Sequence, residues 1–389
     1  MKQEKGFSLI ELMVSMAIIV IVVGLATAAL LQAQHATTAV AMQANTQENL
    51  RAGMHFMVRD IAQAGEGIPQ GGITIPYNAT SAVKRPGTGG ANFPNTYTTL
   101  PAITPGFQLG QFATAVDPKT NVALISPTQR TDVVNILYND DTLVDALGNH
   151  LYSFPVSQLA PAAPVCAGVI SPTGAFVTLV PACFTMPGVV QPISVGNLIM
   201  FHNQNGTALE YVTSIAGDTI NFAAGDPAGL NQTGLPNGTV ANLGPAGVFP
   251  PTTITRVWLV TYYVDSTTPA SPQLIRQVNY PNDPAASPAN PPQDISDMIE
   301  SLSFSYDLTG SGAPVGTYPL GSGNASTPIL PDTPAQIRAV NIFLAGRSEQ
   351  PYTALSTPQF IRNNLSTQVS VRSLSFSNQF QTASGATAP

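Results

Sequence analysis

The residues best placed to do chemistry lie within the first eleven positions of the chain. Gly6 is a small residue just before a long apolar run, and Glu11 is a carboxylate at the start of that run. Proteolysis after Gly6 would leave the apolar run attached and make Phe7 the new N-terminus. A carboxylate at membrane depth is costly without a positive partner. The spacing therefore favours a pair between Glu11 and the α-amine of a neighbouring copy or relative.

The apolar run, residues 12–31, contains no charged residue. As a helix it spans about 30 Å, which is close to the hydrocarbon thickness of a bilayer. A secretory signal has its small-residue cleavage site after the apolar region, and no Ala-x-Ala site directly follows Leu31. The sequence thus predicts an anchor that stays on the mature chain. The alternative is an ordinary signal anchor in which Glu11 reaches the membrane surface.

Few other residues have a pattern that is typical of catalysis. The four histidines are scattered along the chain: His35, His55, His150 and His202. We find no His-Glu-x-x-His, Cys-x-x-Cys, Gly-x-Ser-x-Gly or glycine-rich phosphate motif. We therefore expect a protein that is not an enzyme and that has no metal or other cofactor.

One acidic group could hold a cation. Asp140 and Asp141, with Asp145 close behind, could supply carboxylate oxygens to calcium. Their spacing does not match an EF-hand loop. We favour a solvated turn after a strand.

The only two cysteines are Cys166 and Cys183. In a domain exported past the membrane they can form one disulfide, which would stabilise the fold by about 3 kcal/mol on the chain-entropy model. The alternative is two separate free thiols.

Composition indicates a β-rich body. Only 9% of the 389 residues are charged, and the chain has 35 Pro and 32 Gly. The usual charged fraction is roughly 25%, and frequent turn residues are typical of short strands joined by loops. The net charge of −7 argues against a broad nucleic-acid surface. We therefore predict no nucleic-acid partner.

The N-terminal helix is expected to continue beyond the membrane. Residues 32–63 contain no proline, and Gly65 and Gly67 supply a stop. Apolar residues recur on one face of this extension: Leu50, Met54, Met57 and Ile61. That face should cover a sheet of the body. Gly24 and Gly53 are either flexible points or sites of close packing.

The rest of the chain predicts strands and long loops. Residues 203–206 and 216–218 are typical of hairpin turns. The expected strands are 73–75, 132–138, 176–180, 197–202, 208–215, 219–223, 254–265, 273–279, 298–306, 335–345 and 367–376. The expected long loops are 70–121, 281–294 and 310–334.

Residues 6–12, which read GFSLIEL, resemble the class III signal of type IV prepilins and type II secretion pseudopilins. The resemblance implies cleavage after Gly6 by a prepilin peptidase, N-methylation of Phe7 and a role for Glu11 as the assembly carboxylate. It also implies partners: other major and minor pilins, the pilus assembly machinery of the inner membrane, and membrane lipid before assembly.

Several later segments are similar to PilW-like minor pilins. They are residues 57–65, 132–138, 262–265 with 274–276, 337–348 and 360–372. The long insertions 70–121 and 282–292 depart from that pattern. They leave open what the exposed face recognises.

These observations predict an α+β, pilin-like fold, in which a long N-terminal transmembrane helix packs on a large antiparallel β-rich C-terminal domain. The expected divisions are a leader (1–6), a membrane and assembly helix (7–31), its periplasmic extension (32–66) and a globular head (67–389). Lys2 and Lys5 should keep the leader in the cytoplasm, and this places the head in the periplasm.

The favoured function is a minor pilin of a type IV pilus that helps to initiate or cap the fibre. The expected location is the bacterial inner membrane, and then the fibre at the cell surface. One alternative is a minor pseudopilin of a type II secretion system. Another is a pilus-tip adhesin whose long loops bind a surface.

Overall fold

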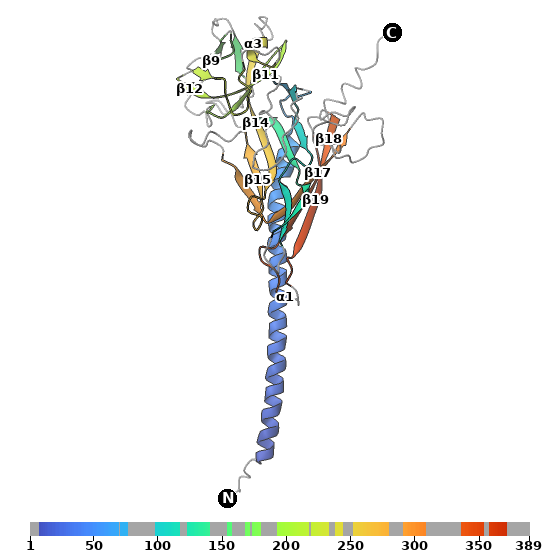
Figure 1. Cartoon of the computed structure of the whole chain (residues 1–389). Helices are drawn as coiled ribbons and strands as arrows, with labels where there is room; N and C mark the ends of the chain where they lie inside the picture. Colours follow the sequence, from blue (N-terminus) through green and yellow to red (C-terminus); the bar gives the residue numbers. More distant parts are fainter. Residues whose placement is uncertain are drawn as a thin grey trace, which may run out of the picture.

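The structure is a computed structural model. It describes residues 8–69, 71–76, 98–116, 123–140, 154–157, 168–171, 173–179, 193–217, 219–232, 238–243, 252–279, 291–308, 336–353 and 358–371. A long helix extends from an antiparallel β-rich head, so that about half of the helix projects free of it (Figure 1). The predicted α+β fold is confirmed.

Helix α1 runs from Leu9 to Gln63, and its 55 residues correspond to about 82 Å. At its start, the side-chain oxygen of Ser8 accepts a hydrogen bond from the N–H of Ile10 at 3.4 Å. The chain leaves the helix through Gly65, whose φ of 79° suits glycine. The N–H of Gly65 donates to the carbonyl of Leu137 at 2.9 Å, so the helix end is tied to the sheet.

Within the described residues, the head consists of strands and one short helix. Their bounds are β1 Ile73–Thr74, β2 Thr99–Leu100, β3 Ile103–Gly106, β4 Phe112–Val116, β5 Ala123–Arg130, β6 Val133–Asn139, β7 Phe154–Ser157, β8 Gly168–Ile170, β9 Phe176–Leu179, β10 Leu198–Asn203, β11 Gly206–Tyr211, β12 Ser214–Ala216, β13 Thr219–Asn221, α3 Val240–Leu243, β14 Thr252–Asp265, β15 Gln273–Val278, β16 Gln293–Asp297, β17 Ile299–Leu308, β18 Ile337–Arg347 and β19 Arg362–Ser370.

Strand β14 organises the larger sheet. Along its first half it pairs with β10 and β7, and along its second half with β6 and β15. The strands β9, β11 and β12 and helix α3 lie at the end of the head that is far from the N-terminus (Figure 1). A separate antiparallel sheet has the order β17-β18-β19. The long β14 therefore links the part of the head around α1 to the distal part.

The main core lies where the two sheets meet α1. The predicted apolar face of the helix is buried there: Leu50, Met54, Met57 and Ile61 are at most 5% exposed. A Cβ added at Gly53 would lie 2.7 Å from Cδ2 of Leu274, whereas nothing lies within 4 Å of one at Gly24. Gly53 is therefore a site of close packing against the head.

Alternation along β14 separates a second cluster from this core. Val260 and Tyr262 face the helix, while Val257 and Leu259 face a second cluster on the opposite side of the sheet. A third cluster around Phe201 fills the distal part of the head. Period-2 side-chain direction in a strand explains how one strand serves two cores.

The structure corrects parts of the predicted strand map. The expected loop 70–121 contains β2, β3 and β4, in addition to the expected strand at residues 73–75. Among the described strands, β3 pairs only with β6, so its Pro105 lies at an edge, where a missing N–H is tolerated. Strand β5 was not expected.

Two other predicted strands have different bounds. The expected strand 208–215 is divided into β11 and β12, and the second of these pairs with β13 as a hairpin. The expected strand 367–376 begins earlier, as β19. Polar residues occupy both faces of β19, as at Asn363 and Asn364, and this hides the alternation on which the prediction depended.

Candidate functional site

The N-terminal part of α1 exposes an apolar surface. It belongs to the one helix among the described residues that is long and apolar enough to cross a membrane. The large apolar side chains from Leu9 to Leu31 are 51% to 80% exposed. Apolar exposure over this length requires lipid or neighbouring helices.

The hydroxyl groups in this segment are satisfied by the helix itself. Ser15 Oγ donates to the carbonyl of Glu11 at 2.6 Å, and Thr27 Oγ1 donates to that of Val23 at 3.0 Å. The carboxylate of Glu11 has no ion pair or side-chain hydrogen bond with any residue that the structure describes. It is therefore the group in this segment that needs a partner from outside the chain.

Several predicted site residues lie outside the described residues. These are Gly6, Phe7, Asp141, Asp145, Cys166 and Cys183. Cleavage after Gly6, methylation of Phe7 and the disulfide therefore stay predictions.

The interpretation of Asp140 as part of a solvated turn is wrong. Asp140 is 2% exposed, and its carboxylate forms an ion pair with Arg256, which is 4% exposed. Burial lowers the pKa of Arg256, although the charge and hydrogen bond of Asp140 act in the opposite direction. The pair joins the end of β6 to β14, so Asp140 serves to position strands.

The histidines are spread out in the structure as they are in the sequence. His35 and His55 lie on α1 and His202 lies exposed on β10, while His150 is outside the described residues. Within the ranges that the structure describes, no three His, Cys, Asp or Glu side chains come together in a way that could hold a metal ion.

The second carboxylate of interest, Asp60, lies at the other end of α1. It is completely buried. Its Oδ2 accepts hydrogen bonds from the Tyr262 hydroxyl at 2.6 Å and from Arg276 Nε at 2.7 Å. Arg59, which is half exposed, adds a bond to Oδ1 at 3.2 Å. The helix is thereby joined to β14 and β15 by a charged group in the middle of the main core.

The electrostatics of this cluster follow from burial and from the charge of Asp60. Burial, followed by the negative charge of Asp60, raises the pKa of Tyr138 to about 12 and also raises that of Tyr262. Burial alone would lower the pKa of Arg276, but its hydrogen bond and ion pair with Asp60 raise it. The arrangement therefore keeps Arg276 charged and both tyrosines protonated.

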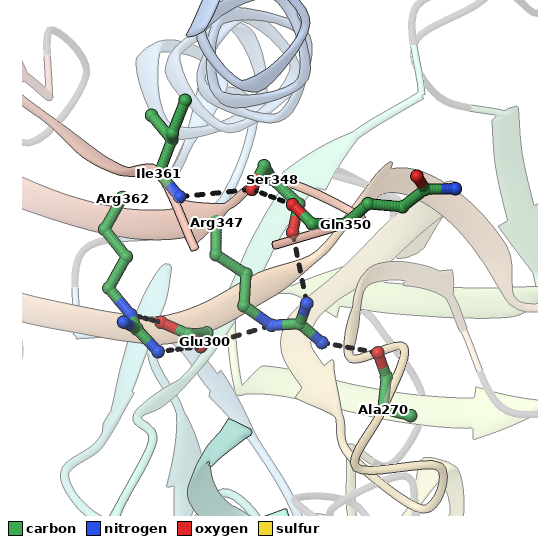
Figure 2. A network of polar contacts seen from close by, with 7 residues as sticks. All are labelled: Ala270, Glu300, Arg347, Ser348, Gln350, Ile361 and Arg362. Carbon is green, nitrogen blue, oxygen red and sulfur yellow. Dashed lines mark hydrogen bonds and ion pairs between the residues drawn. The ribbon is translucent and has the colours of Figure 1, made fainter. Parts of the chain in front are cut away.

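A second polar network secures one end of the three-stranded sheet (Figure 2). Glu300 binds Arg362 Nε at 2.8 Å and Arg347 Nε at 3.2 Å. The guanidinium of Arg347 also donates to the carbonyl oxygens of Ser348 and Ala270, and it lies 4.4 Å from the ring centroid of Phe360. These contacts join three strands and a turn.

Sequence reasoning gave no role to Asp60, Arg276, Glu300 or Arg347. A signal for Asp60 is present, because it lies between Met57 and Ile61 on the apolar face of the helix. A carboxylate in that position must be buried and paired. No comparable local signal identifies its partner, because Arg276 is 216 positions away along the chain.

The comparisons with known proteins bear on the N-terminus. A family model described as the prokaryotic N-terminal methylation motif matches residues 1–27. Comparison with curated proteins and with solved structures found no match. The motif supports the class of type IV prepilins and pseudopilins. It implies processing by a prepilin peptidase and assembly with other pilins, and with helix α1 it fits membrane anchoring at the N-terminus.

Proposed function

We propose that this chain is a minor subunit of a type IV pilus, cleaved after Gly6 and methylated on Phe7, which helps to initiate or cap the fibre. The observation that carries the proposal is the carboxylate of Glu11. It lies in the exposed apolar part of α1 and has no partner among the described residues. In a fibre the α-amine of a neighbouring subunit supplies that partner.

The size of the head supports a minor rather than a major subunit. A major subunit repeats along the fibre, so each head must fit beside its neighbours. Here more than 300 residues follow the helix, and the described strands of the head lie around only the C-terminal part of α1 and continue beyond the helix end (Figure 1). Such a head is easier to accommodate at a fibre end. The similarity of the later segments to PilW-like pilins favours a pilus over a secretion system.

The proposed location follows from the same features. Before assembly the chain spans the inner membrane once, with the head in the periplasm. After assembly α1 lies in the helical core of the fibre and the head lies at the cell surface. The proposed role is structural, with no catalytic step of its own.

The first experiment determines the N-terminus of the full chain extracted from membranes. With an active prepilin peptidase, intact-mass and N-terminal analysis should find a chain that begins at methylated Phe7. Without the peptidase, the leader should remain. Retention of Met1 in peptidase-containing cells, or cleavage beyond Leu31, would contradict the proposal.

The second experiment separates the minor-pilin role from its alternatives. Deletion of the gene should reduce surface pili while major pilin remains in the membrane. Quantitative mass spectrometry of purified fibres should find this chain far below the major pilin. Near-equal abundance would indicate a major subunit, and normal piliation with a protein-secretion defect would indicate a pseudopilin.

A further inference from the structure

The sheet formed by β17, β18 and β19 has one face in the main core and an opposite face with different chemistry. The core face carries apolar residues such as Phe304, Ile342 and Leu344. On the opposite face is a shallow groove of about 530 Å³, whose outward-facing residues are Ser303 and Ser305 of β17, Asn341 and Phe343 of β18, and Ser366 and Gln368 of β19. None of these lining residues is charged. The groove is thus an uncharged depression on the face of the sheet that is turned away from the main core.

The exposed aromatic ring of this groove is that of Phe343, on the middle strand β18. Phe343 is 39% exposed, and its cross-strand neighbours are Ser303 on β17 and Ser366 on β19. The next row of the sheet places Asn341 between Ser305 and Gln368. Small polar side chains therefore surround the ring and leave its surface accessible.

The polar groups around the ring are held in position and remain available. Asp307 accepts hydrogen bonds from Asn341 Nδ2 at 3.0 Å and from Gln368 Nε2 at 2.6 Å. Both amide groups are thereby fixed, and their oxygens remain as acceptors. Among the described residues, none hydrogen-bonds the hydroxyls of Ser303, Ser305 or Ser366. These hydroxyls can donate and accept.

We propose that this groove is a binding site for a neutral carbohydrate. A sugar ring has an apolar C–H face that can pack on the ring of Phe343. Its hydroxyl groups can pair with the serine hydroxyls and with the two amide oxygens. An apolar platform with a few placed polar groups is typical of small-molecule sites, and the volume suits a short saccharide.

The charges at the ends of the sheet favour a neutral ligand over an ionic one. At one end, Glu300 engages both Arg347 and Arg362 (Figure 2). At the other end, the carboxylate of Asp307 lies beside the two amides and would repel an acidic sugar. Within the groove, no cation among the lining residues is available to a carboxylate or a sulfate.

The inference goes beyond the proposed function and does not depend on it, because the site is complete in a single head. It also differs from the sequence-based adhesin alternative. That alternative gives recognition to the long loops, whereas this site is on the regular face of a sheet. Failure of one proposal therefore leaves the other testable.

The test measures sugar binding to the full chain in detergent. The probes are maltotriose, lactose and N,N′,N″-triacetylchitotriose. Saturation-transfer NMR detects binding of each probe, and titration gives its dissociation constant. At least one should bind. Phe343→Ala should weaken it about fivefold, because a stacked aromatic ring contributes on the order of 1 kcal/mol. The matched control is Phe176→Ala on β9, since Phe176 is 41% exposed and lies in the distal part of the head. It should leave binding unchanged.

A second variant blocks the groove without removing the ring. Ser366→Tyr should abolish binding, while its thermal unfolding stays close to that of the unsubstituted chain, because Ser366 is exposed. The proposal is overturned if none of the three probes binds, or if the Phe343 and Phe176 variants lose binding equally. It is also overturned if 3′-sialyllactose binds better than lactose, or if Ser366→Tyr changes self-association of the chain without any sugar binding.

Discussion

Each end of helix α1 carries a carboxylate in an apolar setting, and the two carboxylates differ in their partners. Asp60 is completely buried, and Arg276 and Tyr262 reach it from two strands of the head. Glu11 lies in the exposed N-terminal half, where the structure describes no partner for its side chain. One acid is thus neutralised within the folded chain, and the other is left for a neighbour.

The difference teaches which interactions belong to folding and which to assembly. A buried carboxylate is tolerated only when it is paired and hydrogen-bonded. The head can supply such a partner only to the part of the helix that it surrounds (Figure 1). Changes near Asp60 should therefore affect stability, whereas changes near Glu11 should affect incorporation into fibres.

The largest effect is expected from Asp60→Ala. The substitution leaves the guanidinium of Arg276 buried without its carboxylate, which typically costs about 3–5 kcal/mol. Denaturant unfolding of the full chain in detergent, followed by the β-sheet signal in circular dichroism, measures the loss. Arg59→Gln is the control, because its pair with Asp60 is half exposed and should contribute less than about 1 kcal/mol. Equal effects of the two substitutions would contradict this account of the buried cluster.

A smaller effect is expected from Gly53→Ala. The new Cβ would lie 2.7 Å from Cδ2 of Leu274, which is itself fully buried, so overpacking should cost about 1–3 kcal/mol. Gly24→Ala is the matched change on the free half of the helix, where nothing lies within 4 Å. It should leave the unfolding free energy unchanged or raise it by up to about 1 kcal/mol. The same measurement distinguishes the two, and similar losses would show that packing against the head is not the cause.

A third carboxylate extends the comparison, because it is buried and the described residues place no cation beside it. Glu210 on β11 is 3% exposed, and one long bond of 3.4 Å from the N–H of Val240 is its described contact. Burial, with a smaller contribution from the charge of Asp226, raises the pKa of Glu210 well above its ordinary value of 4.5. The folded state therefore keeps a proton that the unfolded state loses, and stability falls as the pH rises above the ordinary value.

Glu210→Gln should remove this loss of stability at higher pH. The variant should match the unsubstituted chain near pH 4, and its advantage in unfolding free energy should grow toward pH 8. Denaturant titrations at several pH values measure the difference. An advantage that does not change with pH would show that Glu210 is not the group responsible.

The smallest effect on stability is expected from Glu11→Leu. The side chain of Glu11 has no partner within the described structure, so the unfolding free energy should not change, and membrane insertion should if anything improve. Incorporation should fall instead, as measured by the amount of chain in sheared fibres. Glu48→Leu, at an exposed carboxylate farther along the same helix, should be incorporated normally. Normal recovery of the Glu11 variant would remove the proposed role of this residue.

Local patterns in the sequence were enough to predict the helix, its buried face and the longest strands. The uncharged run to Leu31 and the spacing of Leu50, Met54, Met57 and Ile61 are properties of neighbouring residues, and the structure confirms the helix and its buried face. The hairpin of β14 and β15 is also confirmed, because alternation and turn residues are local as well. The methylation motif at residues 1–27 is likewise a pattern of neighbouring residues.

Tertiary structure alone decided which distant groups meet. Nothing near Asp60 indicates Arg276, nothing near Asp140 indicates Arg256, and the neutral groove exists only because β17, β18 and β19 align in register. Strand β3, which contains Pro105, likewise forms only because it can pair with the distant strand β6. The reason is physical: helix and turn preferences depend on a few consecutive residues, whereas the pairing of buried charges and strand edges depends on which surfaces the fold brings together.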